Sequence, residues 1–325
     1  MDYERYQKQI ILPNFGENCQ HKLNNSSIII IGIGGIGCPT LMYLSSMGIG
    51  TIGILDYDRV DISNLHRQLI YTEESIGKSK TLSAKEFCEK RNSNINIIEY
   101  DIKLTNDNTL EILKNYEIII DCTDNIFTRQ LINDACVILN KPYFFGSSIG
   151  TSGQVGIFNY NNTSPCLRCL YSNKINETCE STGVLGVIPG IIGNLLCLEV
   201  IKYICKYESK LTNKLLNYDI IQGFYSVTVP KNPKCLVCSP DAIINIDNYS
   251  KLNIYSPKCS VKFNYSTNIK ENVIYLNNID SLENLFEKYN FIINDLIFNC
   301  ENKIKSKLLV NKLRQSGKSN VWYLI

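Results

Sequence analysis

Residues 27–58, SIIIIGIGGIGCPTLMYLSSMGIGTIGILDYD, decide the fold. A continuous apolar run at 28–31 leads into four glycines within residues 32–37, then into apolar residues at helical spacing, and a second apolar run ends at Asp56. This order predicts a strand, a glycine turn, a helix and a second strand. Glycines let such a turn bring its N–H groups close to a phosphate at the helix N-terminus, and Asp56 is placed to accept hydrogen bonds from a ribose. The pattern therefore predicts a nucleotide-binding site. An NAD-dependent dehydrogenase is the usual kind of protein with such a turn.

The segments after Asp56 continue the alternation. Strands are predicted at 95–100, 116–121 and 142–147, and helices from about residue 78, near residue 110 and at 125–139. Apolar strands that alternate with helices are typical of an α/β protein with a doubly wound, mostly parallel sheet. From residue 153 the pattern changes to hairpin-like strands on either side of a long apolar helix, which predicts an antiparallel extension of the sheet.

The chain divides by composition near its last quarter. Residues 239–257 contain two prolines and many Asn and Asp, a composition typical of a linker. The tail from about residue 260 alternates strand and helix again, which predicts a second, small α/β unit. We therefore predict a first domain at 1–240, a linker at 241–257 and a partial domain at 258–325.

Composition limits the classes of function. The 33 Lys and Arg nearly balance the 31 Asp and Glu, so no basic field indicates nucleic acid or a membrane surface. The first ten residues lack the layout of a signal peptide, and polar residues interrupt the apolar run at 184–205, which predicts a buried helix. The 14 cysteines are scattered apart from two CxxC pairs, as expected in a reducing compartment. We expect a cytoplasmic protein that binds neither nucleic acid nor a membrane.

Polar residues after the second strand favour ATP over NAD. They are Asp58, Asn64, Arg67, Lys80 and the segment 121–125, DCTDN. A triphosphate requires cations to neutralise its charge and an acidic group to hold Mg²⁺, whereas hydride transfer requires no cluster of cations. Each residue also has a plain structural interpretation: Lys80 on a solvated helix face, Arg67 in a surface ion pair, and Asp124 as the N-cap of the next helix. Together, at one sheet edge, they favour ATP with Mg²⁺.

Several motifs then identify a family. They are ERYQKQIILP, GIGGIG, LDYDRVDISNLHRQ, IGKSK, DCTDN, the CLRC and CLVC pairs, and TCESTGVLGVIPGIIG, within about residues 3–240. In this combination the chain resembles the MoeB/ThiF-type activating enzymes, which are related to the ubiquitin E1 proteins. The resemblance implies a Rossmann-like ATP site and attack by a C-terminal glycine carboxylate of a ubiquitin-like protein on the ATP α-phosphate. Such chemistry consists mostly of positioning and charge stabilisation.

The resemblance also assigns residues. The expected nucleotide-binding residues are Gly34, Gly35, Asp56, Asp58, Ser63, Asn64, Arg67, Gln68, Lys80, Asp124 and Asn125, with Arg67, Lys80 and Asp124 catalytic and Asp124 holding Mg²⁺. The family usually has Arg at the position of Lys8, and that Arg reaches the ATP of the partner subunit, which implies a homodimer. Lys8 keeps the charge but lacks the planar fork of Arg.

The cysteines sort by spacing. Cys166, Cys169, Cys235 and Cys238 form two CxxC pairs, the arrangement of a tetrahedral Zn²⁺ site, and the resembling family has zinc there. Cys179, in the polar segment ETCE, matches the family's thioester-forming or persulfide-forming cysteine; an inert loop residue is the alternative. Five others lie in apolar patterns that predict core residues: Cys38, Cys122, Cys136, Cys197 and Cys205.

The tail resembles the second half of a rhodanese domain. Cys300 would end a strand and begin a loop whose N–H groups cradle a persulfide, with Lys303 and Lys305 lowering the pKa of its thiol. The loop CENKIKS lacks the usual Arg and Gly of that family. A degenerate domain kept for packing or docking is therefore the alternative to an active one.

These observations predict an adenylyltransferase that activates a small sulfur-carrier protein of the ThiS or MoaD type. Sulfur transfer would follow through Cys179, Cys300 or both, with a cysteine desulfurase as a sulfur donor, and would yield a thiocarboxylate. Three alternatives stay open: an activator of a ubiquitin-like modifier that passes on a thioester without sulfur, a non-catalytic nucleotide-binding protein, and an NAD dehydrogenase.

Overall fold

The computed structural model describes residues 2–171, 183–242 and 244, together with the backbone of four strands in the tail. The chain forms two compact units, Met1–Ser250 and Lys251–Ile325, each described separately below. Cys179 and most of the expected linker lie outside the described residues.

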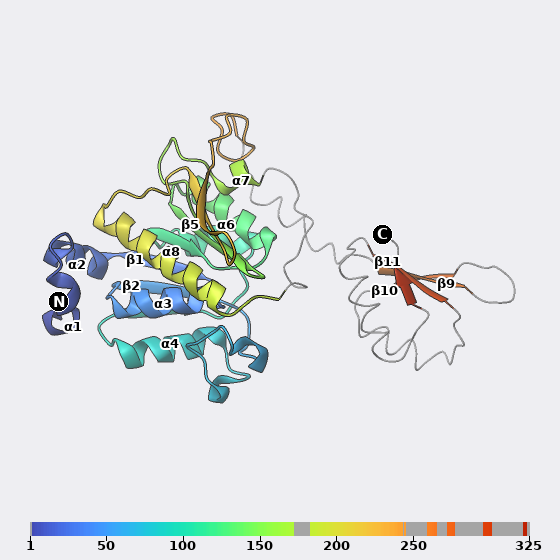
Figure 1. Cartoon of the computed structure of the whole chain (residues 1–325), viewed down its shortest axis with the longest axis horizontal. Helices are drawn as coiled ribbons and strands as arrows, with labels where there is room; N and C mark the ends of the chain where they lie inside the picture. The colour runs from blue at the N-terminus through green and yellow to red at the C-terminus, as the bar shows by residue number, and fades with distance from the viewer. Residues whose placement is uncertain are drawn as a thin grey trace. The chain divides into compact units, whose positions relative to one another are not determined.

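The first unit is built on an eight-stranded sheet (Figure 1). Its strands are β1 (Ser27–Ile31), β2 (Thr51–Leu55), β3 (Asn96–Tyr100), β4 (Ile118–Asp121), β5 (Tyr143–Ile149), β6 (Ser152–Phe158), β7 (Lys214–Asp219) and β8 (Gly223–Thr228). They run in the order β3-β2-β1-β4-β5-β6-β7-β8. The first five in this order are parallel, and β6, β7 and β8 add an antiparallel extension. The predicted fold class is confirmed.

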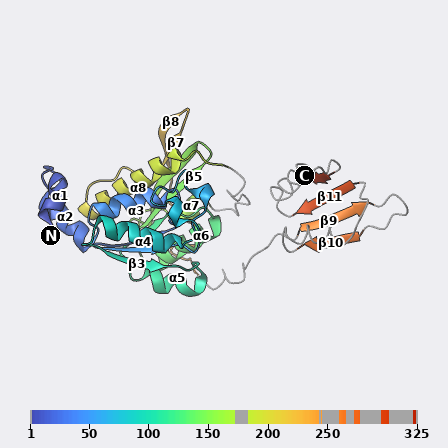
Figure 2. The same cartoon turned by 90° about the horizontal axis from the view of Figure 1, so that it is seen from below.

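Helices cover both faces of this sheet because each apolar strand points its side chains alternately to two cores. On one face Ile28 and Ile30 of β1 join the core with α2 (Gly16–Asn25), α3 (Gly37–Ser46), α4 (Lys80–Arg91) and α8 (Val187–Cys205). On the other face Ile29 and Ile31 join α5 (Asn106–Leu113), α6 (Ile126–Ile138) and α7 (Leu167–Leu170). Figure 2 shows α4 and α5 on opposite sides of β3.

The long apolar helix α8 belongs to the core. By length and composition alone it could cross a membrane, and 56% of its apolar window is buried inside the protein. Gly193 allows a close approach to α3, because a Cβ there would lie 2.6 Å from the Ile36 carbonyl oxygen. The Thr40 hydroxyl of α3 donates to the Gly193 carbonyl at 3.3 Å. The helix is therefore packed as the sequence predicts.

The N-terminal leader forms two helices that the sequence reasoning did not foresee, α1 (Tyr3–Ile10) and α2. Tyr6 is buried against Gly48, whose φ of +87° and lack of a side chain accommodate the ring. The Asn92 side-chain amide donates to the Tyr6 hydroxyl at 2.9 Å. These contacts hold α1 on the domain and leave Lys8 exposed on its outer side.

The second unit contains a four-stranded sheet in the order β10-β9-β11-β12. Its strands are β9 (Cys259–Asn264), β10 (Asn272–Leu276), β11 (Asp295–Cys300) and β12 (Val321–Tyr323). Strands β11 and β12 are parallel, whereas β9 runs antiparallel to both neighbours. The helices expected between these strands lie outside the described residues.

Candidate functional site

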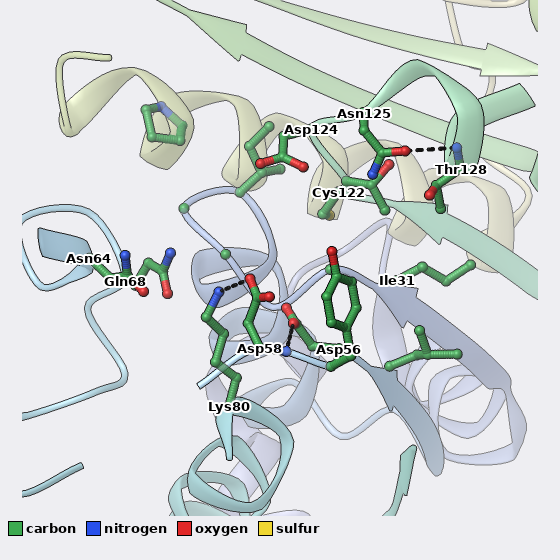
Figure 3. A pocket seen from close by; sticks show the side chains of 18 of the residues that line it. Ile31, Asp56, Asp58, Asn64, Gln68, Lys80, Cys122, Asp124, Asn125 and Thr128 are labelled. Carbon is green, nitrogen blue, oxygen red and sulfur yellow. Dashed lines mark hydrogen bonds and ion pairs between the residues drawn. The ribbon is translucent and has the colours of Figure 1, made fainter. Parts of the chain in front are cut away.

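A cavity of about 480 Å³ opens where β1, β2 and β4 end. In the strand order, β1 has β2 on one side and β4 on the other, so the connections leave it in opposite directions. Open α/β sheets bind ligands at this topological switch point, outside the carboxyl ends of the strands. The glycine turn and the segment after β4 both line the cavity, and Figure 3 shows Asp124 and Asn125 on one side of it with Asp56, Asp58 and Lys80 on the other.

The glycine turn presents unpaired donors to the cavity. Gly32 has φ +88°, and a Cβ there would lie 2.9 Å from the Cys122 carbonyl oxygen, so no other residue suits the position. Within the described part of the chain, the N–H groups of Gly34, Gly35 and Ile36 make no hydrogen bond. They precede the ten-residue helix α3, where the helix dipole favours an anion. The turn is built to receive a phosphate group.

Two cationic side chains border the same cavity. Lys80 is only 5% exposed, and its Nζ lies 2.8 Å from Oδ2 of Asp58. Arg67 donates to the Ser63 carbonyl at 2.9 Å, and its Cδ would lie 3.4 Å from a Cβ at Gly35, so it lies against the glycine turn. Both residues are therefore within the neighbourhood that a bound polyphosphate would occupy.

Asn64 and Gln68 line the cavity beside these cations. Gln68 is buried, and among the described residues its Oε1 has no hydrogen-bond partner. Buried polar atoms are nearly always paired, so an orphan at a cavity wall indicates a place for ligand or water. The side chains of Ser63 and Lys8 do not line the cavity, and the Ser63 hydroxyl instead donates to Asp61 at 2.6 Å.

Asp56 stabilises the glycine turn through hydrogen bonds to its backbone. It is 8% exposed, and its two carboxylate oxygens accept from the N–H groups of Ile33 (2.7 Å) and Asp58 (2.9 Å). Burial raises the pKa of Asp56, and the charge of Lys80 opposes that rise. Each carboxylate oxygen has a second lone pair, so the group can still accept from a ribose hydroxyl while holding the turn.

Asp124 lies across the cavity from Lys80 and Asp58 (Figure 3). The alternative that Asp124 caps the following helix is wrong. Asn125 is the N-cap of α6, and its side-chain oxygen accepts from the Thr128 N–H at 2.9 Å. The exposed carboxylate of Asp124 makes no hydrogen bond or ion pair with any described residue. It is therefore available to a cation in the cavity, and its oxygens are ligands that Mg²⁺ prefers.

The sequence reasoning missed Arg129 in α6. This side chain is 9% exposed and lines the cavity, where Nε donates to the Thr123 carbonyl at 3.2 Å and Nη1 to Ser147 Oγ at 3.1 Å. Its guanidinium also lies 5.0 Å from the centre of the Phe145 ring. Side chains in the first turn of a helix point back towards its N-terminus, so recognising Asn125 as the N-cap would have indicated that Arg129 reaches this edge of the sheet.

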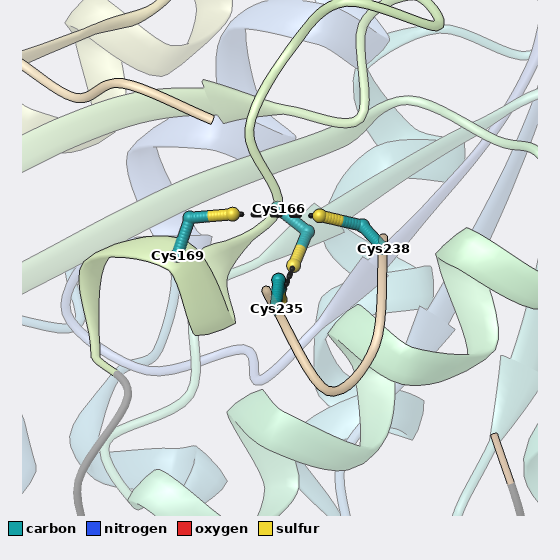
Figure 4. Close-up of side chains that lie close together, drawn as sticks. All are labelled: Cys166, Cys169, Cys235 and Cys238. Carbon is teal, nitrogen blue, oxygen red and sulfur yellow. Dashed lines mark hydrogen bonds between the residues drawn. The ribbon is translucent and has the colours of Figure 1, made fainter. Parts of the chain in front are cut away.

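The four predicted zinc ligands meet at a separate place in the first unit (Figure 4). The Sγ atoms of Cys166, Cys169, Cys235 and Cys238 all lie within 4.8 Å of one another. Two pairs are at 3.6 Å (Cys166 to Cys235) and 3.4 Å (Cys169 to Cys238). A tetrahedral Zn²⁺ with bonds of about 2.3 Å would place its sulfurs about 3.8 Å apart. The donor set and its spacing fit zinc.

Hydrogen bonds within this cluster shift its acidities in opposite directions. Those from Cys166 and Cys238 lower the pKa of the Cys169 thiol, whereas the bond with Cys169 raises the pKa of the Cys166 thiol. The Asn232 N–H also donates to Cys169 Sγ at 3.3 Å. Thiolate character of this kind suits a metal ligand.

The cluster is fastened to α6. The Leu167 N–H donates to the Asn133 side chain at 2.7 Å, and Arg168 pairs with Asp134 at 3.0 Å. Both acceptors belong to α6, the helix that begins beside Asp124. The five cysteines predicted for the core are all buried, as expected: Cys38, Cys122, Cys136, Cys197 and Cys205.

Cys300 is the last residue of β11, so it ends a strand as expected, and its register partner across the sheet is Cys259 of β9. Its loop lies outside the described residues.

Comparison with known proteins places the first unit in a family. Residues 6–237 match the model of the ThiF family. The chain belongs to this family. It is 44% identical over 264 residues to the adenylyltransferase and sulfurtransferase MOCS3 of Aedes aegypti, an alignment covering 79% of this chain and 59% of that protein. The chain thus spans about three fifths of that relative's length.

A shorter relative and a solved structure match the same region of this ThiF-family chain. The sulfur carrier protein adenylyltransferase of Thermus thermophilus is 38% identical over 249 residues, covering 74% of this chain and 92% of that protein. The crystal structure of E. coli MccB with AMPCPP and MccA superposes with a TM-score of 0.64 at 26% identity, covering 73% of this chain and 75% of that one.

Proposed function

We propose that the protein adenylates the C-terminal glycine of a small ubiquitin-like sulfur-carrier protein of the ThiS or MoaD type, using ATP, and that sulfur transfer then gives a thiocarboxylate. The observation that carries the proposal is the cavity at the switch point. Unpaired N–H groups, two cations and an unpaired carboxylate surround one space there. The names of the relatives in insects and Thermus support the same activity.

Residues of different charge would bind different parts of the ATP molecule. The N–H groups of the glycine turn would hold phosphate oxygens, Asp56 would bind the ribose, and Lys80 and Arg67 would neutralise charge on the triphosphate. Asp124 would hold Mg²⁺, which shields the phosphates when bound. A carrier carboxylate oxygen then bonds to the α-phosphorus, and the bond to pyrophosphate breaks with its electron pair. No proton moves in this step, so the site needs positioning and cations more than a general base.

For the second half of the reaction we propose persulfide chemistry at Cys300, Cys179 or both, with sulfur from a cysteine desulfurase. The terminal persulfide sulfur attacks the acyl carbon of the adenylate and AMP leaves. A second thiol then attacks the cysteine sulfur of this acyl disulfide, so that the S–S bond breaks, the thiocarboxylate leaves, and a disulfide forms between the two thiols. An external thiol reductant would reduce that disulfide before the next turnover. Residues 258–325 would form the rhodanese-like part and residues 1–240 the adenylating part, joined by the linker at 241–257.

Two further assignments complete the proposal. The cysteine cluster would hold one structural Zn²⁺ through Cys166, Cys169, Cys235 and Cys238, which supplies a cross-link between the two ends of that part of the chain. Lys8 is exposed and outside the cavity of its own chain, so it could serve a cavity only in a second subunit, as in a homodimer. A cytoplasmic location stays part of the same proposal.

The test is exchange of labelled pyrophosphate into ATP with each candidate carrier protein present. We expect exchange with a carrier that ends in glycine and none with the same carrier lacking that residue. Absence of exchange with every carrier would leave a non-catalytic nucleotide-binding protein. Exchange without any thiocarboxylate in the presence of a desulfurase and cysteine would identify a modifier activator instead. Equilibrium dialysis with NAD tests the dehydrogenase alternative.

A further inference from the structure

One buried tyrosine hydroxyl outside the cavity lining forms a hydrogen bond with the glycine turn. Tyr71 is 5% exposed and does not line the cavity. Its hydroxyl donates to the Ile33 carbonyl at 2.9 Å and, more weakly, to the Lys80 carbonyl at 3.3 Å. On the other side of the same residue, the Ile33 N–H donates to Asp56 at 2.7 Å. Ile33 is thus held at both its donor and its acceptor.

The carbonyl of Ile33 and the N–H of Gly34 belong to one peptide group. In a trans peptide these two groups point in opposite directions. Because Tyr71 draws the carbonyl into the core, the N–H of Gly34 must face away from the core, where the cavity lies. Glycine itself imposes little restriction on the backbone, so hydrogen bonds to the Ile33 carbonyl fix the orientation of this peptide. The Cys38 thiol also donates to this carbonyl, at 3.5 Å, but a thiol is a weak donor, so the Tyr71 hydroxyl contributes the stronger bond.

We propose that Tyr71 is a positioning residue for phosphate binding: its hydroxyl fixes the Ile33–Gly34 peptide so that the Gly34 N–H is preorganised towards a phosphate group. The inference rests on the proposed function, since it takes ATP as the ligand. Preorganised donors contribute more to binding than donors that must reorient, because the ligand does not have to supply the ordering free energy.

The second acceptor of Tyr71 extends the same role to a cation. The Lys80 carbonyl lies in the first turn of α4, and the side chain of Lys80 carries the charge that pairs with Asp58. The Tyr71 hydroxyl therefore contacts both the peptide that carries the Gly34 N–H and the first turn of α4, where Lys80 lies. Burial raises the pKa of the Tyr71 phenol, which keeps the hydroxyl a donor throughout the working pH range.

The experiment compares Tyr71→Phe with a matched control. Tyr116→Phe also removes a buried tyrosine hydroxyl, one that lies 3.0 Å from the Tyr100 hydroxyl and does not line the cavity. Binding of ATP and of adenosine to the full chain is measured by equilibrium dialysis, and the melting temperature of each variant is recorded. The ratio of the two affinities isolates the phosphate contribution from any general loosening of the site.

We expect Tyr71→Phe to weaken ATP binding about tenfold, as the loss of one well-placed hydrogen bond implies, and to leave adenosine binding unchanged. Tyr116→Phe should leave both affinities unchanged. Equal weakening of ATP and adenosine, or no weakening of either, would overturn the role of Tyr71 while the proposed function stands. If the wild-type chain binds no ATP, the proposed function fails and this inference fails with it.

Discussion

The nucleotide cavity and the cysteine cluster are built in opposite ways. The cavity collects side chains from segments spread between Ile31 and Pro189, and several of its polar groups lack partners within the described part of the chain. The cluster uses two short segments, 166–169 and 235–238, whose sulfurs are already within reach of one another. Unsatisfied groups cost stability unless a ligand pairs them. The cavity therefore has the features of a ligand-binding site, whereas the cluster has those of a structural metal site.

Helix α6 is the element that both regions share. Its N-terminal end, with Asn125 and Arg129, borders the cavity, and its middle, with Asn133 and Asp134, holds the segment of Cys166. Substitutions in the cavity beside the N-terminal end of this helix should therefore affect chemistry, and substitutions in the cysteine cluster beside its middle should affect stability. The predictions below test that separation.

The largest effect is expected from Asp124→Ala. The carboxylate has no structural partner among the described residues, so its loss should lower pyrophosphate exchange at least about 100-fold and leave the melting temperature unchanged. Asp107→Ala, which removes an exposed carboxylate in the first turn of α5, is the control. Near-normal exchange by folded Asp124→Ala protein would end the assignment of this residue as the Mg²⁺ ligand.

Cys235→Ser should show the opposite pattern. Loss of one of four metal ligands should remove zinc and lower the melting temperature by about 10 °C, as expected when a structural zinc site is lost. ATP affinity at low temperature should stay within about twofold of wild type, because no cysteine of the cluster lines the cavity. Metal analysis of freshly purified, reduced wild-type protein provides the check, and absence of zinc would contradict the account of this cluster.

Asp56→Asn should weaken ATP binding and raise the melting temperature at neutral pH. Burial raises the pKa of Asp56, so its ionised form costs stability at neutral pH. The contribution of a group with a raised folded-state pKa is fully present below its unfolded pKa and is lost as pH rises through the folded pKa. The variant should therefore melt at a higher temperature than wild type at pH 7, and the difference should shrink towards pH 4, while ATP binding weakens. Thermal melts across this range test the sign, and a lower melting temperature at pH 7 would show that the bonds to Ile33 and Asp58 dominate.

The smallest effect on exchange is expected from Cys300→Ala and Cys179→Ala. The acyl-adenylate forms before any thiol attacks, so both variants should exchange pyrophosphate at the wild-type rate. Thiocarboxylate formation should fall in whichever variant lacks the working thiol, measured by intact mass of the carrier. If Cys300→Ala forms thiocarboxylate normally, the tail does not hold the persulfide sulfur, and transfer runs through Cys179 or an external donor.

Local spacing explains what the sequence could predict. Three features can be recognised from a few neighbouring residues: the glycine turn, Asp56 at the end of a strand, and the two CxxC pairs. The structure places them where the sequence predicted. Long-range geometry explains what it could not. Tyr71 and Arg129 donate to backbone carbonyls that only the folded chain places beside them. Asn125, instead of Asp124, became the helix cap because the helix begins one residue later than the motif suggested.

The most direct test of the central claim is the mass of a carrier protein after incubation with ATP, Mg²⁺ and the enzyme, with no sulfur donor present. The account predicts AMP attached to the C-terminal glycine when the enzyme is wild type or folded Cys235→Ser, and almost none with Asp124→Ala. Undiminished adenylate from folded Asp124→Ala, or no adenylate on any carrier from the wild-type enzyme, would contradict the claim that this cavity performs the chemistry.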